Sequence, residues 1–280
     1  MTYRSLLFVP GARPDRFEKA VASGADAVCI DLEDAVAPHL KDEARAHALH
    51  FLERAHDGAA VGLRLNALGG AEAEADIAAF GRSRAKPAFV MIPKAVGAGD
   101  IDVVRSALGA DCPPLWPLVE TPEGLLAAAD IARAVGGART SKGSSSGGVM
   151  FGGADYAASI GSDMSWDALA YARGALVNAA AIGACGLIDV PYLDVRDEAG
   201  LRAETARVKA MGFTGRACIH PAQIDAVNEI FTPSTEETAR AERVVAAYEA
   251  AEGGVALLDG KLIEKPVLRA AERVLARRKD

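Results

Sequence analysis

The stretch Pro117-Leu118-Val119-Glu120-Thr121-Pro122-Glu123-Gly124 is the part of the sequence from which the fold can be worked out. It follows an apolar segment, residues 113–116, that is typical of a short buried strand, and it precedes residues 125–131, whose composition and spacing are helical. Glu120 therefore stands where a strand gives way to a helix, with a proline and a glycine shaping the turn. A carboxylate at the carboxyl end of a buried strand is well placed to bind a cation or a substrate, although capping the next helix or pairing with an arginine would also explain it.

Apolar segments and helical segments alternate along residues 1–232. The apolar segments predict strands at residues 5–9, 27–30, 61–66, 89–92, a fifth that ends at Glu120, 148–151, 186–189 and 216–221. The segments that follow them predict helices at residues 14–23, 41–55, 72–80, 100–108, 124–135, 167–183, 198–211 and 223–231. This alternation, with little spare length, indicates an α/β fold of the (β/α)8 TIM barrel type. A doubly wound open sheet ranks lower because no Gly-x-Gly-x-x-Gly follows the first strand.

Residues 233–280 follow the predicted barrel as a short extension. A helix is expected over residues 235–251, and a second helix from Pro266 to the end. Between them, Asp259-Gly260 separates two short apolar runs, which is typical of a β-hairpin. We therefore predict a C-terminal helix-hairpin-helix extension. It is too small to fold alone, so we expect it to dock on the barrel or on a neighbouring subunit.

Composition limits the classes of partner and location. The chain has 280 residues and a net charge of −7, with acids and bases interspersed, which argues against nucleic acid and anionic membrane as partners. No apolar run approaches the roughly 20 residues that a membrane-spanning helix needs. The amino terminus has no signal-peptide pattern, and the four cysteines are scattered without metal-type spacing. These features predict a cytoplasmic protein with reduced thiols.

Polar residues stand at the carboxyl ends of the predicted strands, where the active sites of such barrels collect. They are Asp31, Glu33, Asp34, Arg64, Asn66, Lys94, Glu120, Asp155, Asp189 and His220. Core packing explains none of them, and we expect them to converge on one rim. Helix capping or an ordinary ion pair fits Asp34, Asp189 and His220 at least as well.

The mixture of charges points to a cation and an oxyacid bound together. Glu120 and Asp155, on neighbouring strand ends, suit Mg²⁺, which takes one or two carboxylates and keeps waters that substrate oxygens can replace. No His/Cys cluster favours zinc. Arg64 offers a planar donor for a substrate carboxylate, and Lys94 adds a second positive charge. We therefore predict Lewis-acid catalysis on a chelating oxyacid. A Schiff base on Lys94 is disfavoured beside Arg64 and a metal.

Six motifs, spread in order over essentially the whole chain, resemble those of the HpcH/HpaI aldolase and citrate lyase beta-subunit family. They are residues 4–11 (RSLLFVPG), 23–28 (SGADAV), 31–36 (DLEDAV), 119–124 (VETPEG), 152–156 (GGADY) and 215–224 (GRACIHPAQI). The branch that they resemble most is the stand-alone citrate lyase beta-like proteins, which are similar to malyl-CoA and citramalyl-CoA lyases. The resemblance implies Mg²⁺ held by Glu120 and Asp155, and a substrate carboxylate on Arg64. It also implies a homo-oligomer, a trimer or hexamer, in which the carboxyl-terminal segment covers a neighbour's active site.

One position departs from the family. Relatives that act on acyl-CoA carry an aspartate just before the proline of the carboxyl-terminal hairpin, whereas this chain has Glu264. The added methylene moves the carboxyl group by more than about an ångström, which can cost on the order of a hundredfold in rate. We take Arg64, Glu264 and Glu33 as the candidate catalytic residues, and Arg64, Lys94 and Glu120 as the candidate substrate-binding residues.

The predicted reaction is reversible cleavage of a 3-hydroxy-3-carboxy acyl-CoA, such as malyl-CoA or citramalyl-CoA, into a 2-oxo acid and an acyl-CoA. Three alternatives stay open at this point. They are an acyl-CoA thioesterase, a malate-synthase-like condensing enzyme, and a non-catalytic citrate lyase subunit or metabolite-binding protein. The Gly/Ser-rich segment 136–148 predicts a flexible surface loop, with a mobile flap over an anionic substrate as the alternative.

Overall fold

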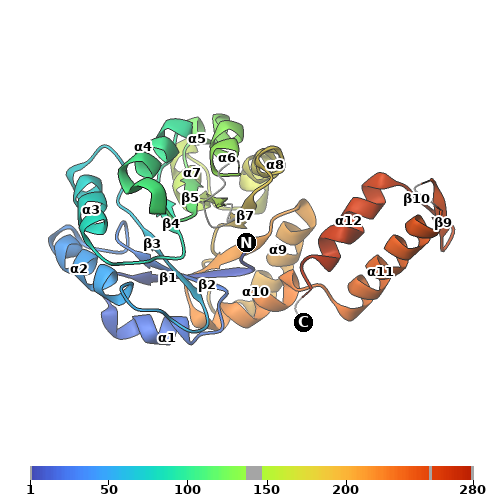
Figure 1. Ribbon diagram of the computed structural model, residues 1–280, viewed down its shortest axis with the longest axis horizontal. Helices are drawn as coiled ribbons and strands as arrows, with labels where there is room; N and C mark the ends of the chain where they lie inside the picture. Colours follow the sequence, from blue (N-terminus) through green and yellow to red (C-terminus); the bar gives the residue numbers. More distant parts are fainter. Residues whose placement is uncertain (1, 137–146, 252–253, 279–280) are drawn as a thin grey trace. The chain divides into compact units, whose positions relative to one another are not determined.

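Residues 2–136, 147–251 and 254–278 are described by the computed structural model, and within them eight parallel strands close into a barrel (Figure 1). The strands are β1 (Ser5–Pro10), β2 (Ala27–Asp31), β3 (Ala60–Arg64), β4 (Val90–Ile92), β5 (Leu115–Val119), β6 (Gly148–Phe151), β7 (Gly186–Asp189) and β8 (Gly215–Cys218). Each pairs with the next along the chain, and β8 closes on β1 with Leu6 beside Ala217. The predicted (β/α)8 TIM barrel is therefore confirmed.

Helices follow the strands around the outside of the barrel (Figure 1). They are α1 (Phe17–Val21), α2 (Lys41–Phe51), α3 (Ala71–Arg82), α4 (Ala98–Leu108), α5 (Pro122–Leu126), α6 (Ala128–Gly136), α7 (Gly153–Ile160), α8 (Trp166–Gly183), α9 (Glu198–Met211) and α10 (Ile224–Phe231). Single 3₁₀ turns add η1 (Pro14–Arg16), η2 (Pro38–Leu40), η3 (Gly109–Asp111) and η4 (Pro221–Gln223). Most of the Gly/Ser-rich segment 136–148 lies outside the described residues.

Two helices differ from the sequence prediction. The helix expected over residues 124–135 is divided into α5 and α6 at Ala127. For the segment after β6 the sequence analysis predicted no helix, but this segment forms α7 and carries Asp155 in its first turn. The glycines at its start lower the helix propensity, but the alanines that follow and an acid near the helix amino terminus favour the helix.

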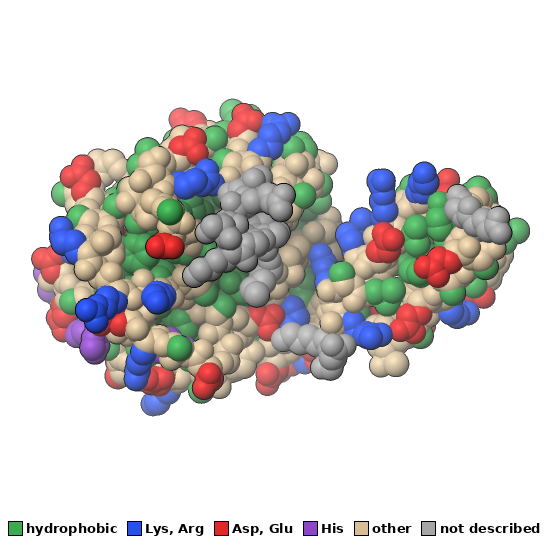
Figure 2. All heavy atoms as spheres, viewed as in Figure 1, with side chains coloured by type: hydrophobic (Ala, Val, Ile, Leu, Met, Phe, Trp, Pro, Cys, Tyr) green, Lys and Arg blue, Asp and Glu red, His purple; other side chains and the backbone are tan. Residues whose placement is uncertain are grey.

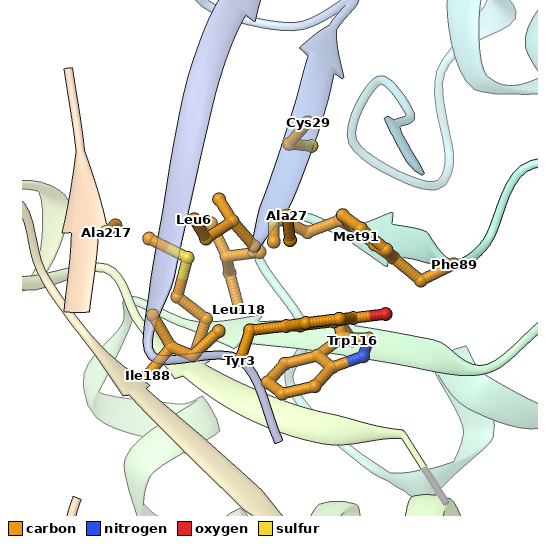
Figure 3. Close-up of a cluster of buried hydrophobic side chains, with 11 residues drawn as sticks. Tyr3, Leu6, Ala27, Cys29, Phe89, Met91, Trp116, Leu118, Ile188 and Ala217 are labelled. Atoms are coloured by element: carbon orange, nitrogen blue, oxygen red, sulfur yellow. The ribbon is translucent and has the colours of Figure 1, made fainter. Parts of the chain in front are cut away.

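The barrel interior is filled by large side chains that lie against glycines. Tyr3 lies 5.6 Å from Trp116, ring centroid to ring centroid, with the two rings tilted by 33°, and Figure 3 shows both rings among aliphatic side chains. A Cβ on Gly148 would stand 2.4 Å from the Trp116 ring, and one on Gly62 would stand 2.4 Å from the Phe89 ring. Only glycine fits at these positions. This packing fills the end of the barrel at which the strands begin.

Side chains along each strand point alternately into the barrel and out of it, and this alternation positions the polar residues of the mouth. In β2 and β5 the interior cluster contains Cys29 and Leu118, so the next inward positions are Asp31 and Glu120. On β3 the strand register sets Arg64 beside Asp31. Charged side chains therefore replace apolar ones at the carboxyl-terminal end of the barrel interior.

The carboxyl-terminal part of the chain has its own small core. The chain consists of two compact units, Met1–Asn228 and Glu229–Asp280. The second unit comprises α11 (Thr235–Ala250), β9 (Ala256–Leu258), β10 (Lys261–Ile263) and α12 (Lys265–Leu275). Both turn residues of the hairpin have positive φ, as a tight two-residue hairpin requires. Val244, Tyr248 and Ile263 pack together at its centre. This is the predicted helix-hairpin-helix.

The surface and the cysteines bear on the partners considered above. Acidic and basic side chains are interspersed over the face shown in Figure 2. Among the described residues, no helix is long and apolar enough to cross a bilayer. The four cysteines are unpaired, and Cys29 and Cys218 are buried.

Candidate active site

Glu120 is a buried carboxylate at the barrel mouth. The residue is 1% exposed, and its Oε1 accepts a hydrogen bond of 2.7 Å from the backbone N–H of Lys94. No described residue donates a hydrogen bond to Oε2, which lies against the backbone of Gly152. Burial, reinforced by the nearby charge of Glu33, raises the pKa of the Glu120 carboxyl to about 8. An oxygen-seeking cation would relieve this penalty, because it keeps the carboxylate ionised.

Gly152 makes room for this carboxylate. A Cβ at that position would stand 2.4 Å from both Cβ and Oε2 of Glu120. We expect Gly152→Ala to displace the Glu120 side chain, to lower the free energy of unfolding by about 1–3 kcal/mol, and to weaken Mg²⁺ binding at least about tenfold. Gly174→Ala on α8 is the control, because a Cβ there has no atom within 4 Å. Titration calorimetry and denaturant unfolding measure both effects, and unchanged Mg²⁺ affinity in Gly152→Ala would contradict the placement of Glu120.

Arg64 is held in the mouth by two acids from β2 and the loop after it. Its Nε and Nη2 donate to the two oxygens of Asp31 at 2.7 and 2.6 Å. Its Nη1 lies 3.0 Å from Oε2 of Glu33, although that oxygen has no hydrogen bond among the described residues. The two-pronged edge of Arg64 is thus used by Asp31, and Nη1 is the donor that faces an unsatisfied partner. The guanidinium also stacks on the ring of Phe8, 5.1 Å from its centroid.

Lys94 follows β4 directly and bridges two acids of the site. Its Nζ donates to Oε1 of Glu33 at 2.9 Å and lies 3.8 Å from Asp34. The hydrogen bond to Glu33 raises the pKa of the Lys94 ammonium. Burial raises the pKa of the Glu33 carboxyl, while Arg64 and Lys94 oppose that rise. The ammonium is therefore engaged by protein carboxylates rather than left as a separate positive charge for substrate.

Asp155 lies in the first turn of α7, on the exposed side of the mouth. Its negative charge contributes to the raised pKa of Glu120, so the two carboxylates interact electrostatically. In the described part of the chain, no group of three or more His, Cys, Asp or Glu side chains is arranged to hold a metal ion. Two carboxylates with a free oxygen on Glu120 suit Mg²⁺, which takes few protein ligands and keeps its waters.

Three residues predicted to share the rim do not join this cluster. Asn66 is hydrogen-bonded to Asp76 on α3 through both its backbone and side-chain nitrogens. Asp189 points away from the interior and is paired with the buried Arg173 of α8. His220 caps η4, because its Nδ1 accepts from the N–H of Ala222. The prediction of one rim was therefore wrong for Asp189, whereas the side chains of Asn66 and His220 are engaged in local contacts at their strand ends.

Lys41 supports the site and was not singled out from the sequence. Its Nζ donates to the carbonyls of Leu32 and Glu33 and to Oδ1 of Asn66, at 2.6–2.7 Å. It thus fixes the loop that carries Glu33. A signal was present in the sequence, because a lysine at the first residue of a helix opposes the helix dipole and needs another partner.

Glu264 belongs to the carboxyl-terminal unit. It is exposed and is the N-cap residue of α12, where its side chain makes no capping hydrogen bond. Its backbone carbonyl accepts from the N–H groups of Val267 and Leu268. The carboxylate is free to extend from the start of the helix.

Comparison with protein families identifies the family of this chain. Residues 4–221 match the family model described as HpcH/HpaI aldolase/citrate lyase. The chain belongs to this family. Residues 166–279 also match a model described as a C–C bond lyase of the TIM-barrel fold. The family includes carbon–carbon lyases, among them relatives of this chain, and the resemblance noted in the motifs is confirmed.

Individual members of the HpcH/HpaI family align over nearly the whole chain. The (3S)-malyl-CoA thioesterase of Cereibacter sphaeroides is 39% identical over 98% of this chain and 94% of its own length. The mitochondrial citramalyl-CoA lyase of Rattus norvegicus is 32% identical over 97% of this chain and 85% of its own. The crystal structure of protein CitE from Mycobacterium tuberculosis in complex with magnesium, acetoacetate and coenzyme A superposes with a TM-score of 0.79 at 33% identity, covering 98% of this chain and 97% of that one.

Proposed function

We propose that this protein is a Mg²⁺-dependent lyase that reversibly cleaves a 3-hydroxy-3-carboxy acyl-CoA, such as malyl-CoA or citramalyl-CoA, into a 2-oxo acid and an acyl-CoA. The observation that carries the proposal is that one barrel mouth contains both Arg64, which Asp31 holds, and a buried Glu120 whose Oε2 has no hydrogen-bond donor among the described residues. Magnesium in the solved structure of CitE, and CoA esters in the names of two relatives, support the same chemistry.

We assign a role in this reaction to four residues of the mouth. Glu120 and Asp155 would hold Mg²⁺, which when bound supplies a Lewis acid for the hydroxyl and carboxylate oxygens of the substrate. Nη1 of Arg64 orients the substrate carboxylate and stabilises charge on the departing 2-oxo acid. Glu33, beside Arg64, is placed to accept the hydroxyl proton. The electron pair of the broken C–C bond passes to the thioester, whose enolate must then be protonated.

We propose Glu264, supplied by a neighbouring subunit, as the acid for that protonation. We expect Glu264→Gln to lower kcat at least about a hundredfold, because the amide cannot donate a proton to the enolate. Mg²⁺ affinity should stay unchanged. Glu264→Asp is the matched control, because it keeps the acid and adds a preferred N-cap, which should stabilise α12 by about 1 kcal/mol. Full activity of Glu264→Gln in a steady-state assay would remove this residue from the mechanism.

Hydrolysis is the second candidate, because a relative of 39% identity is named (3S)-malyl-CoA thioesterase. The two reactions separate by their products. A lyase releases a 2-oxo acid and leaves the thioester intact, whereas a thioesterase releases free CoA and a hydroxyacid. A condensing enzyme would instead form malate and free CoA from acetyl-CoA and glyoxylate.

The deciding experiment incubates purified protein with (3S)-malyl-CoA or citramalyl-CoA, with Mg²⁺ or with EDTA. We expect Mg²⁺-dependent release of glyoxylate or pyruvate, detected as the hydrazone, without release of thiol. Free CoA in step with substrate loss would establish the thioesterase instead. Inactivity toward both esters with Mg²⁺ present would favour the non-catalytic role of a citrate lyase subunit or a metabolite-binding protein.

We also infer that the protein acts in the cytoplasm as a homo-oligomer, a trimer or hexamer. Unpaired cysteines support a reducing compartment. The oligomer would allow Glu264 to reach a neighbouring mouth. Light scattering of the purified protein distinguishes these states from a monomer.

A further inference from the structure

Lys94 combines an unusual backbone conformation with contacts on both sides of the site. Its φ is 51°, in the left-handed region that side chains other than glycine rarely adopt. Among the described residues, Ala184 and Asp259 share this conformation, and they serve as a helix C-cap and a hairpin turn residue. Lys94 instead stands directly after β4, at the mouth. Strained backbone of this kind persists only where its surroundings hold it in place.

The backbone of Lys94 fixes one oxygen of Glu120. The N–H of Lys94 donates to Oε1 at 2.7 Å, and the next N–H, from Ala95, donates to the carbonyl of Leu118 on β5 at 3.1 Å. The left-handed turn therefore lays this segment over the end of β5. Glu120 Oε1 is occupied as a result, while Oε2 is left for a cation.

The side chain of Lys94 fixes the other half of the site. Its Nζ holds Oε1 of Glu33 at 2.9 Å, and Oε2 of Glu33 lies 3.0 Å from Nη1 of Arg64. An unbroken series of contacts thus runs from Glu120 through Lys94 and Glu33 to Arg64. The Lys94 side chain is 42% exposed, whereas that of Glu33 is 5% exposed, so the lysine closes this series on its outer side.

We propose that Lys94 is a positioning residue that couples the cation-binding carboxylate Glu120 to the anion-binding Arg64. Its N–H orients Glu120, and its ammonium orients Glu33 and thereby Nη1 of Arg64. This inference rests on the proposed function for the identity of the two ligands, a divalent cation and a carboxylate. It replaces the sequence-based role of Lys94 as a residue that contacts substrate.

The side-chain half is tested by Lys94→Met, Glu33→Gln and the double variant, with binding measured by calorimetry. The probes are Mg²⁺ alone, and oxalate in the presence of Mg²⁺, so no turnover is needed. We expect Lys94→Met to weaken oxalate binding about tenfold and to leave Mg²⁺ affinity within about threefold. In the Glu33→Gln background, Lys94→Met should add little, because both changes break the same linkage. Independent, multiplying losses would show that Lys94 contacts the anion directly and would overturn the proposal.

The backbone half is tested by comparing Lys94→Gly with Lys94→Ala. Both lack the ammonium, but only glycine adopts φ near +50° without strain. We expect the melting temperature of Lys94→Gly to exceed that of Lys94→Ala by about 2 °C or more, and Mg²⁺ affinity to be stronger in the glycine variant. Equal values for both variants would overturn the backbone half. The melting comparison is independent of the proposed function, since a protein that binds no Mg²⁺ at all would refute that function and leave this readout intact.

Discussion

Glu120→Gln is expected to lose Mg²⁺ binding and to lower kcat/KM about a thousandfold or more. The amide oxygen can still accept the N–H of Lys94, so the fold around the mouth is kept, but the ionised oxygen offered to the cation is gone. Lewis-acid stabilisation is worth several kcal/mol, which sets the size of the effect. Calorimetry with Mg²⁺ and a product assay measure both losses. Glu123→Gln, a nearby exposed acid on α5, is the control and should keep both properties.

The stability and the Mg²⁺ affinity of the wild-type protein should both depend on pH, and Glu120→Gln should alter this dependence. Without a cation, the folded protein holds the Glu120 proton up to a pKa of about 8, whereas the unfolded chain releases it near about 4.3. The stability that this neutral carboxyl contributes is complete below the unfolded pKa and is lost as the pH rises toward 8. Mg²⁺ affinity should rise over the same interval as proton competition falls. Glu120→Gln should remove this contribution from the pH dependence of stability and from that of Mg²⁺ affinity. If the change in either quantity between pH 5 and pH 8 were the same in Glu120→Gln as in the wild type, the burial of the Glu120 charge would be contradicted.

The sequence predicted the barrel because its signal is repeated. Each apolar run ends in a turn residue or a charge and is followed by a helix, so an error at one boundary does not change the fold. The missed helix α7 shows the limit of this approach. Two glycines in succession lower the helix propensity of this segment, but Gly152 is required by the side chain of Glu120 rather than by a turn. That requirement comes from β5 and cannot be seen in the local sequence.

The candidate site was predictable only in part, because strands of a parallel barrel are apolar on both faces. Their sequences therefore do not show which residues point inward. Glu120 points into the barrel, whereas Asp189 points outward to Arg173 on α8, although both end an apolar run. The bidentate pair of Asp31 and Arg64 depends on the register of β2 against β3. Such cross-strand neighbours become visible only once the strands are paired.

Removal of Arg64 should affect stability and activity together. Its side chain is 12% exposed and faces Asp31 and Glu33, which are 2% and 5% exposed. Arg64→Met leaves the buried Asp31 without its ion-pair partner and leaves Glu33 with Lys94 alone, and we expect the free energy of unfolding to fall by about 3–5 kcal/mol. Arg64→Lys keeps the positive charge. Its single nitrogen, however, cannot bind both oxygens of Asp31 and also donate a hydrogen bond to the substrate. We therefore expect its kcat/KM to fall at least about a hundredfold with a smaller loss of stability.

A compensating change separates the two effects of Arg64. Asp31→Asn removes the charge that Arg64→Met leaves unpaired, so the double variant should recover part of the lost stability, measured by denaturant unfolding. It should recover no activity, because the donor for the substrate carboxylate is still missing. Restored turnover in the double variant would show that Arg64 only neutralises Asp31. Restored stability without turnover would show that the guanidinium binds the substrate. Its Nη1 would then provide a hydrogen bond that an uncharged pair at positions 64 and 31 cannot provide.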